Sequence, residues 1–177
     1  KAVWEPEGKR MLLGVTPKNI EPRFDTGVDA WLRALSGSKH AALAEWIAGT
    51  HQRYIHRPAT ALVAIGEHGI GKTLTSIVCG RLWNADAPVD LAHVVKQFNS
   101  SMARCPVVLD DECATLAKKL VTTEDFRTLV QKRVRSYEPK GLEMRVLHGA
   151  QRFVITANDV SKLTFANAMG AGAVEAI

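Results

Sequence analysis

The chain has 177 residues, of which 46% are hydrophobic, and this length and composition suit one globular domain with a buried core. No run reaches the roughly 18 consecutive apolar residues of a membrane span, and the first ten residues lack the apolar segment of a signal peptide, so we expect a cytoplasmic protein with no membrane contact. Lysine and arginine outnumber aspartate and glutamate by 23 to 18, a formal charge of +5 that suits a polyanionic partner without requiring one.

The cysteines and histidines do not form a metal-binding pattern. Cys79, Cys105 and Cys113 are odd in number and lack the paired short spacing of a zinc site, and the six histidines are scattered. We interpret the cysteines as buried free thiols and expect no metal site built from cysteine and histidine.

The first 57 residues divide into two parts. Residues 1–25 contain several prolines and no sustained period, which predicts an irregular lead-in or linker. In residues 26–57, apolar residues recur at helical spacing over 28–35 and 40–51, and this predicts a helical hairpin. Its tryptophans, Trp31 and Trp46, are either core residues, which the spacing favours, or a stacking platform for bases.

Residues 58–177 show the alternation of an α/β fold. The apolar run 61–65 is followed by a glycine-rich loop and by helical spacing over 74–83, which gives the order strand, loop, helix. Two more apolar runs follow at 106–109 and 152–156, with a helical stretch near 124–135 between them. This order predicts a central, mostly parallel sheet with helices packed on it.

The loop GEHGIGKT, residues 66–73, has the composition of a phosphate-binding loop. Glycines at 66, 69 and 71 allow positive φ and let backbone N–H groups approach phosphate oxygens. Lys72 would reach the β and γ phosphates of ATP, and the Thr73 hydroxyl would ligate Mg²⁺ at the start of a helix. A merely flexible glycine turn is the alternative, which the preceding strand disfavours. The predicted nucleotide-binding segment consists of Gly66, Glu67, His68, Gly69, Ile70, Gly71, Lys72, Thr73 and Leu74.

The second apolar run ends in Asp110, Asp111 and Glu112. Adjacent carboxylates at the end of a buried strand require a cation or a partner, because like charges repel and desolvation is costly. In an ATP-hydrolysing site, one aspartate holds Mg²⁺ and a glutamate activates the attacking water. We favour Asp111 for the metal, with Asp110 as a rival, and Glu112 for the water. Acids in the first turn of a helix are the alternative.

The third apolar run ends at Asn158, which we expect beside the acids at the carboxyl edge of the sheet. An amide there would hold the attacking water or contact the γ phosphate, although Asn-Asp is also a common turn pair. The predicted catalytic residues are Lys72, Asp111, Glu112 and Asn158.

Together, five segments resemble the superfamily three helicase domain of phage and plasmid primase-helicases. They are GEHGIGKT, FNSSM at 98–102, VVLDDEC at 107–113, EPKG at 138–141 and RFVITAND at 152–159. The resemblance covers about residues 31–158. That family combines a phosphate loop, an acidic strand end, a basic residue in a hairpin and a strand-terminal asparagine. The two outer motifs are general to P-loop ATPases, and the middle two are distinctive.

The resemblance implies a three-layer P-loop NTPase of AAA+ type that acts as an ATP-dependent helicase motor. It also implies a homo-oligomeric ring, of six subunits, that translocates on single-stranded DNA, with Lys140 gripping the DNA. Other basic residues near Lys140 in the sequence would enlarge the positive field, although a solvated basic surface is the alternative. They are Lys132, Arg133, Arg135 and Arg145.

The sequence departs from this family after Asn158, where an arginine-rich stretch is expected but residues 158–177 contain no arginine. Three explanations stay open. The chain is a fragment, which we favour, or Arg127, Arg133 or Arg152 completes a neighbouring site, or the ring is not catalytically complete. Two other functions share these motifs. An AAA-type remodelling or switch ATPase acting on a protein is the main alternative, and a small-molecule kinase is disfavoured by the acids and the terminal asparagine.

Overall fold

Four short strands rich in valine, isoleucine and leucine form the central sheet. The structure is a computed structural model that describes residues 2–4, 11–13, 21, 23–52, 60–82, 87–96, 99–103, 105–117, 122–149 and 151–159. The strands are β3 (Leu62–Ile65), β4 (Val89–Asp90), β5 (Val107–Asp110) and β8 (Arg152–Ala157). Their order is β3-β8-β5-β4, and every neighbouring pair is parallel. The predicted mixed α/β fold with a parallel central sheet is confirmed.

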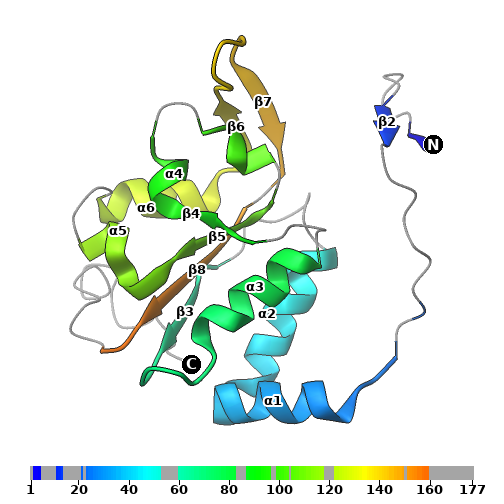
Figure 1. Cartoon of the computed structure of the whole chain (residues 1–177), viewed down its shortest axis with the longest axis vertical. Coiled ribbons are helices and arrows are strands. Elements are labelled where there is room, and N and C mark those ends of the chain that lie inside the picture. Colours follow the sequence, from blue (N-terminus) through cyan, green and yellow to red (C-terminus); the bar gives the residue numbers. More distant parts are fainter. Residues whose placement is uncertain are drawn as a thin grey trace.

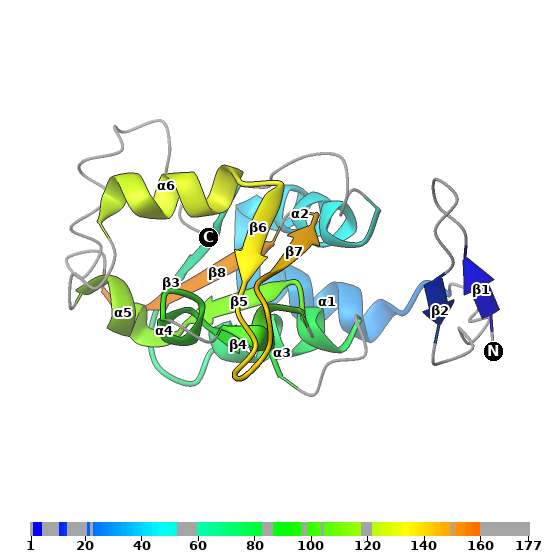
Figure 2. The same cartoon turned by 90° about the horizontal axis from the view of Figure 1, so that it is seen from above.

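Helices cover both faces of this sheet, as Figures 1 and 2 show from two directions. On one face lie α1 (Thr26–Ser36), α2 (His40–Gln52) and α3 (Lys72–Arg81). On the other lie α4 (Leu91–Val94), α5 (Ala114–Ala117) and α6 (Thr123–Gln131). Because both faces are covered, all six residues of β8 are buried, and the strand reads as an apolar run rather than as an alternating pattern.

The core lies between β8 and its covering helices. Phe126 of α6 and Phe153 of β8 are each 1% exposed, and their rings meet edge to face with centroids 5.5 Å apart. This aromatic geometry adds a directional contact to the area that the pair buries. It fixes α6 against β8, one of the two central strands of the sheet.

The two N-terminal helices lie where helical spacing predicts them. Asp25 caps α1, because its Oδ1 accepts hydrogen bonds from the backbone N–H groups of Gly27 and Val28 at 2.8 and 3.0 Å. In α2, the Trp46 indole donates to the Thr60 carbonyl at 2.8 Å and packs against the core. Trp46 is therefore a packing residue. The division of the chain into a lead-in, a helical hairpin and a core remains a prediction.

Two segments differ from the predicted elements. Helix α6 ends at Gln131, because Lys132 adopts an extended backbone, and residues Val134–Tyr137 form strand β6 rather than more helix. Strand β6 pairs antiparallel with β7 (Arg145–His148). In the predicted irregular lead-in, β1 (Ala2–Trp4) and β2 (Met11–Leu13) pair antiparallel. Phe98, part of the FNSSM segment, lies outside the described residues.

The three cysteines are free and buried, as predicted. Burial raises the pKa of the Cys79 thiol to about 11, because desolvation disfavours the thiolate. Among the described residues, no group of three or more histidine, cysteine, aspartate or glutamate side chains is arranged to hold a metal. None of the described helices is both long enough and apolar enough to span a membrane.

Candidate functional site

Three parallel strands bring the candidate residues to one edge of the sheet. The register pairs Ile65 of β3 with Ala157 of β8, and Asp110 of β5 with Ile155 of β8. Because β8 lies between β3 and β5, Asn158 emerges between the glycine loop and the acids. The Gly66 N–H donates to the Ala157 carbonyl at 3.1 Å and extends the pairing into the loop.

The loop backbone depends on its glycines. Gly69 and Gly71 have φ values of 82° and 98°, which side-chain-bearing residues rarely adopt. A Cβ on Gly66 would lie 2.5 Å from Cδ1 of Ile70, closer than real Cβ contacts. The loop leads directly into α3, whose first N–H groups are free of helical partners and favour an anion.

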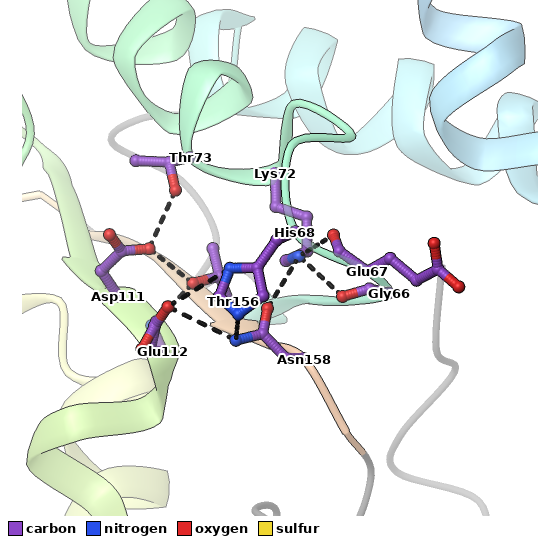
Figure 3. A network of polar contacts seen from close by, with 9 residues as sticks. All are labelled: Gly66, Glu67, His68, Lys72, Thr73, Asp111, Glu112, Thr156 and Asn158. Atoms are coloured by element: carbon purple, nitrogen blue, oxygen red, sulfur yellow. Dashed lines mark hydrogen bonds and ion pairs between the residues drawn. The ribbon is translucent and has the colours of Figure 1, made fainter.

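Lys72 is the first residue of α3 and is only 8% exposed. Its Nζ donates to the carbonyls of Gly66 and Glu67 at 2.7 and 2.6 Å and to Oδ1 of Asn158 at 3.2 Å (Figure 3). These three acceptors match the three N–H bonds of an ammonium group, and all are neutral oxygens. They fix the position of Lys72 without cancelling its positive charge.

Asp111 is held by two hydroxyl groups. Its Oδ1 accepts from Thr73 Oγ1 at 2.9 Å and from Thr156 Oγ1 at 2.6 Å. Thr156, on β8, is 1% exposed and also accepts from the Glu112 N–H at 2.8 Å. Thr156 therefore orients both acids, a role that the sequence prediction missed. The available signal was a hydroxyl in an otherwise apolar buried run, two residues before Asn158.

The backbone turns sharply at Glu112, within the short 3-10 helix η4 (Asp111–Cys113). Glu112 and Cys113 have φ values of 52° and 55°, which are uncommon for residues other than glycine. Such a conformation costs about 1–3 kcal/mol per residue and persists where the surroundings impose it. Here the Glu112–Thr156 hydrogen bond and the complete burial of Cys113 impose it.

Asn158 connects the lysine to the glutamate. While its Oδ1 accepts from Lys72, its Nδ2 lies 2.9 Å from His68 Nε2 and 3.4 Å from Glu112 Oε1. His68 Nδ1 lies 3.7 Å from the same Glu112 oxygen. Figure 3 shows these side chains converging from the loop, from η4 and from the end of β8.

The structure separates Asp110 from Asp111. Asp110 is 2% exposed, and its Oδ1 accepts from the Thr115 N–H in α5 at 2.8 Å. It matches the alternative of an acid at the start of a helix. Asp111 instead faces Thr73, and a carboxylate with a hydroxyl is a ligand pair that Mg²⁺ accepts.

A cavity of about 350 Å³ opens between these groups. Gly66, Glu67, Ile70 and Asp110 are not part of its lining, although Gly66 and Glu67 supply the carbonyls that hold Lys72. Its lining consists of His68, Gly69, Gly71, Lys72, Thr73, Leu74, Asp111, Glu112, Thr156 and Asn158.

Residues 64–168, or 105 of the 177, match the sequence profile of a family of unknown function, DUF5906. The chain belongs to this family. The matched range of this DUF5906 member includes the loop, the acids, the β6–β7 hairpin and Asn158. No curated protein matches the chain.

The fold is similar to solved structures of the C-terminal region of NrS-1. Two of these, both of its A form without ligand, have TM-scores of 0.64 and 0.65 at 18% identity, and each match covers 89% of this chain and 39% of the other. A further ligand-free structure has a TM-score of 0.68 at 20% identity, with 89% and 41% covered. The DUF5906 chain thus has a fold similar to part of that region and spans about two fifths of its length.

Lys140 lies away from the cavity, in the turn between β6 and β7. The turn is closed by a hydrogen bond from the Leu142 N–H to the Pro139 carbonyl at 3.1 Å, with Gly141 at φ 75°. The hairpin precedes the amino end of β8, whereas Asn158 follows its carboxyl end. Figure 1 accordingly places the hairpin at the far end of the sheet from the carboxyl edge.

The prediction that Arg135 enlarges the basic surface around Lys140 is wrong. Arg135 is 4% exposed, its guanidinium lies 5.4 Å from the centroid of the Phe153 ring, and it donates to the Leu129 and Lys132 carbonyls. Burial lowers its pKa to about 10. The side chain points into the core because the aromatic face and the carbonyls at the end of α6 accept its charge.

Burial also distinguishes the three arginines that the sequence offered for completing a neighbouring site. Arg152, the first residue of β8, is 2% exposed, so its side chain is not presented at the surface for such a role. Arg127 and Arg133 are exposed and stay available for that role, and Arg133 remains with Lys132 and Arg145 on the surface near the hairpin.

Proposed function

We propose that this chain is a P-loop NTPase of AAA+ type that binds ATP in the cavity at the carboxyl edge of the sheet and hydrolyses it. The observation that carries the proposal is the convergence of Lys72, the Thr73–Asp111 pair and the Glu112–Asn158 pair on one cavity. A fixed lysine, a hydroxyl–carboxylate pair and a carboxylate–amide pair are the groups that phosphoryl transfer to water requires.

Each group has a defined role in this proposal. Lys72 and the loop N–H groups bind the β and γ phosphates, whose negative charge Lys72 offsets. Thr73 and Asp111 would hold Mg²⁺, which when bound neutralises charge on the phosphates. Glu112 accepts the proton of the attacking water, and the Asn158 amide orients that water.

The direct test is phosphate release from ATP with Lys72→Ala as the inactive variant. We expect the variant to lose hydrolysis and to bind ATP more weakly, because the charge that offsets the phosphates is gone. Lys96→Ala, which removes an exposed lysine outside the cavity, is the matched control and should hydrolyse as the wild type does. Equal hydrolysis by wild type and Lys72→Ala would refute the proposal.

We further propose that hydrolysis drives movement along single-stranded DNA, in a ring of subunits that serves phage or plasmid DNA replication. The resemblance to superfamily three helicases and the net charge of +5 support this function. So does the exposed Lys140 at the tip of a hairpin that leads into β8. Strand β8 is hydrogen-bonded on both sides, to β3 and to β5. A displacement of Asn158 at its carboxyl end would therefore be transmitted along β8 to the hairpin at its amino end.

Oligo-dT tests this second step. We expect oligo-dT to stimulate ATP hydrolysis and to shift the mass of the protein toward that of a ring, because assembly would place several hairpins around one strand. Stimulation and the change in mass are measured on the same samples. A protein that hydrolyses ATP at one rate with and without oligo-dT is not a DNA motor.

A remodelling ATPase that acts on a protein is the second candidate. Four exposed apolar residues on the hairpin favour it, because exposed apolar groups that lie together mark protein contacts. These are Val134, Leu142, Met144 and Val146, and Met144 is 68% exposed. Stimulation by an unfolded protein such as casein, with no response to oligo-dT, would select this candidate.

A further inference from the structure

We propose that His68 is a positioning residue for hydrolysis: its neutral imidazole fixes the Asn158 amide and the Glu112 carboxylate relative to the phosphate-binding loop. The inference rests on the proposed ATP hydrolysis and assigns it a residue that the loop motif does not specify. His68 occupies a position of the G-x-x-x-x-G-K-[ST] pattern at which any residue is allowed.

The geometry is a closed ring of three side chains from three elements. His68 Nε2 lies 2.9 Å from Asn158 Nδ2, Asn158 Nδ2 lies 3.4 Å from Glu112 Oε1, and Glu112 Oε1 lies 3.7 Å from His68 Nδ1. Figure 3 shows the imidazole joined to both other groups by dashed lines. His68 is therefore in contact with both the group that activates water and the group that orients it.

Lys72 determines the hydrogen-bond directions in this ring. An ammonium group only donates, so the atom of Asn158 that faces Lys72 Nζ is the carbonyl oxygen Oδ1. The other atom, Nδ2, then faces His68 and Glu112 and can only donate. His68 Nε2 must accept, so the proton of the neutral ring is on Nδ1, the nitrogen that faces the Glu112 carboxylate.

This tautomer links Glu112 to the loop that binds phosphate. His68 precedes Lys72 by four residues, so a shift of the loop moves the imidazole and with it the preferred position of Glu112. The side chains of His68 and Glu112 are largely exposed, and exposed contacts of this kind are individually weak. The expected effect is therefore on the rate of hydrolysis and not on folding.

Steady-state kinetics provide the first test. His68→Ala should lower kcat for ATP about five- to tenfold with little change in KM, because binding through Lys72 is retained. His68→Gln should recover part of kcat, since its amide offers both an acceptor and a donor. His93→Ala, which removes an exposed histidine on α4, is the matched control. An active wild type with an unchanged kcat in His68→Ala would overturn the role of His68.

The tautomer provides a second test that needs no turnover. In the ¹⁵N spectrum of the whole protein, the His68 ring should carry its proton on Nδ1, with Nε2 as an unprotonated acceptor. Asn158→Ala should return the ring to the tautomer mixture of an exposed histidine. A wild-type ring protonated on Nε2 would overturn the inference. A wild type with the expected tautomer but no ATP hydrolysis would instead refute the proposed function.

Discussion

The carboxyl edge of the sheet and the β6–β7 hairpin hold their functional side chains in opposite ways. At the edge, Lys72 makes three hydrogen bonds and Asp111 accepts two, all within the protein. At the hairpin tip, Lys140, Leu142 and Met144 are exposed on a turn closed by its backbone. The edge holds its polar side chains in fixed positions, whereas the tip leaves charge and apolar surface exposed.

The root of the hairpin resembles the edge rather than the tip. Within β6, Arg135 is buried against Phe153. Where β6 meets the turn, the Glu138 N–H donates to Oδ1 of Asn99 at 3.1 Å. Arg135 thus joins the hairpin to Phe153 of β8, whereas the tip is exposed. Variants at the edge should therefore change the chemistry or stability of the protein, and variants at the tip should change its binding.

The largest expected effect is that of Glu112→Gln at the edge. The amide keeps the size of the side chain but cannot accept a proton from water, so ATP hydrolysis should fall by about 10²-fold or more. Binding of a fluorescent ATP analogue should persist. Glu124→Gln, at an exposed position of α6, is the control. Full hydrolysis by Glu112→Gln would show that the carboxyl edge is not the catalytic centre.

Thr156→Val should destabilise the protein by about 1–3 kcal/mol, because it leaves the Glu112 N–H without its acceptor and Asp111 without one of its two donors. The two side chains have nearly the same shape, so the change isolates the hydroxyl. Urea unfolding measures it, with Thr128→Val at an exposed position as the control. Equal stability of Thr156→Val and wild type would show that the edge is less tightly organised than its hydrogen bonds indicate.

Lys140→Ala tests whether the hairpin tip binds DNA. If Lys140 contacts one DNA phosphate, its loss should weaken oligo-dT binding to a similar extent for every sequence and reduce the salt dependence by about one phosphate contact. Fluorescence anisotropy at several salt concentrations measures both. Lys39→Ala, which removes a lysine between α1 and α2, is the control. An unchanged salt slope would remove Lys140 from the DNA contact.

The smallest expected effect concerns Cys79, a buried residue of α3. Its pKa is raised by burial from 9.0 to about 11, so the unfolded state loses the thiol proton first as pH rises. The Cys79 contribution to the free energy of unfolding should be constant below pH 9 and decrease between pH 9 and 11. At pH 8 the native thiol should react slowly with a thiol reagent and quickly in urea. Rapid reaction of the native protein would contradict its burial.

The strand ends were predictable from the sequence because the information is local. Strands buried on both faces appear as apolar runs, and parallel strands bring their carboxyl ends to one edge. The runs before Gly66, Asp111 and Asn158 therefore indicated β3, β5 and β8. The helical pair before them was predictable from its spacing for the same reason.

The remaining features depend on contacts between distant residues. The sharp turn after Asp111 follows from the positive φ of Glu112, whose N–H donates a hydrogen bond to Thr156, 44 positions later in the chain. The burial of Arg135 depends on Phe153, 18 residues later. Strand β6 follows α6 after two residues and is too short to show a period. None of these three features can be predicted from a short stretch of the sequence alone.

The position of β8 between β3 and β5 limits where this chain can accept a change in length. Adding or deleting one residue in β8 would turn Thr156 to the opposite face of the sheet and withdraw it from both acids. Lengthening the turn 138–144 would cost only the entropy of closing a larger loop, which grows slowly with length. That turn is therefore the site at which a fluorescent label or an affinity tag can be inserted while the carboxyl edge keeps its architecture.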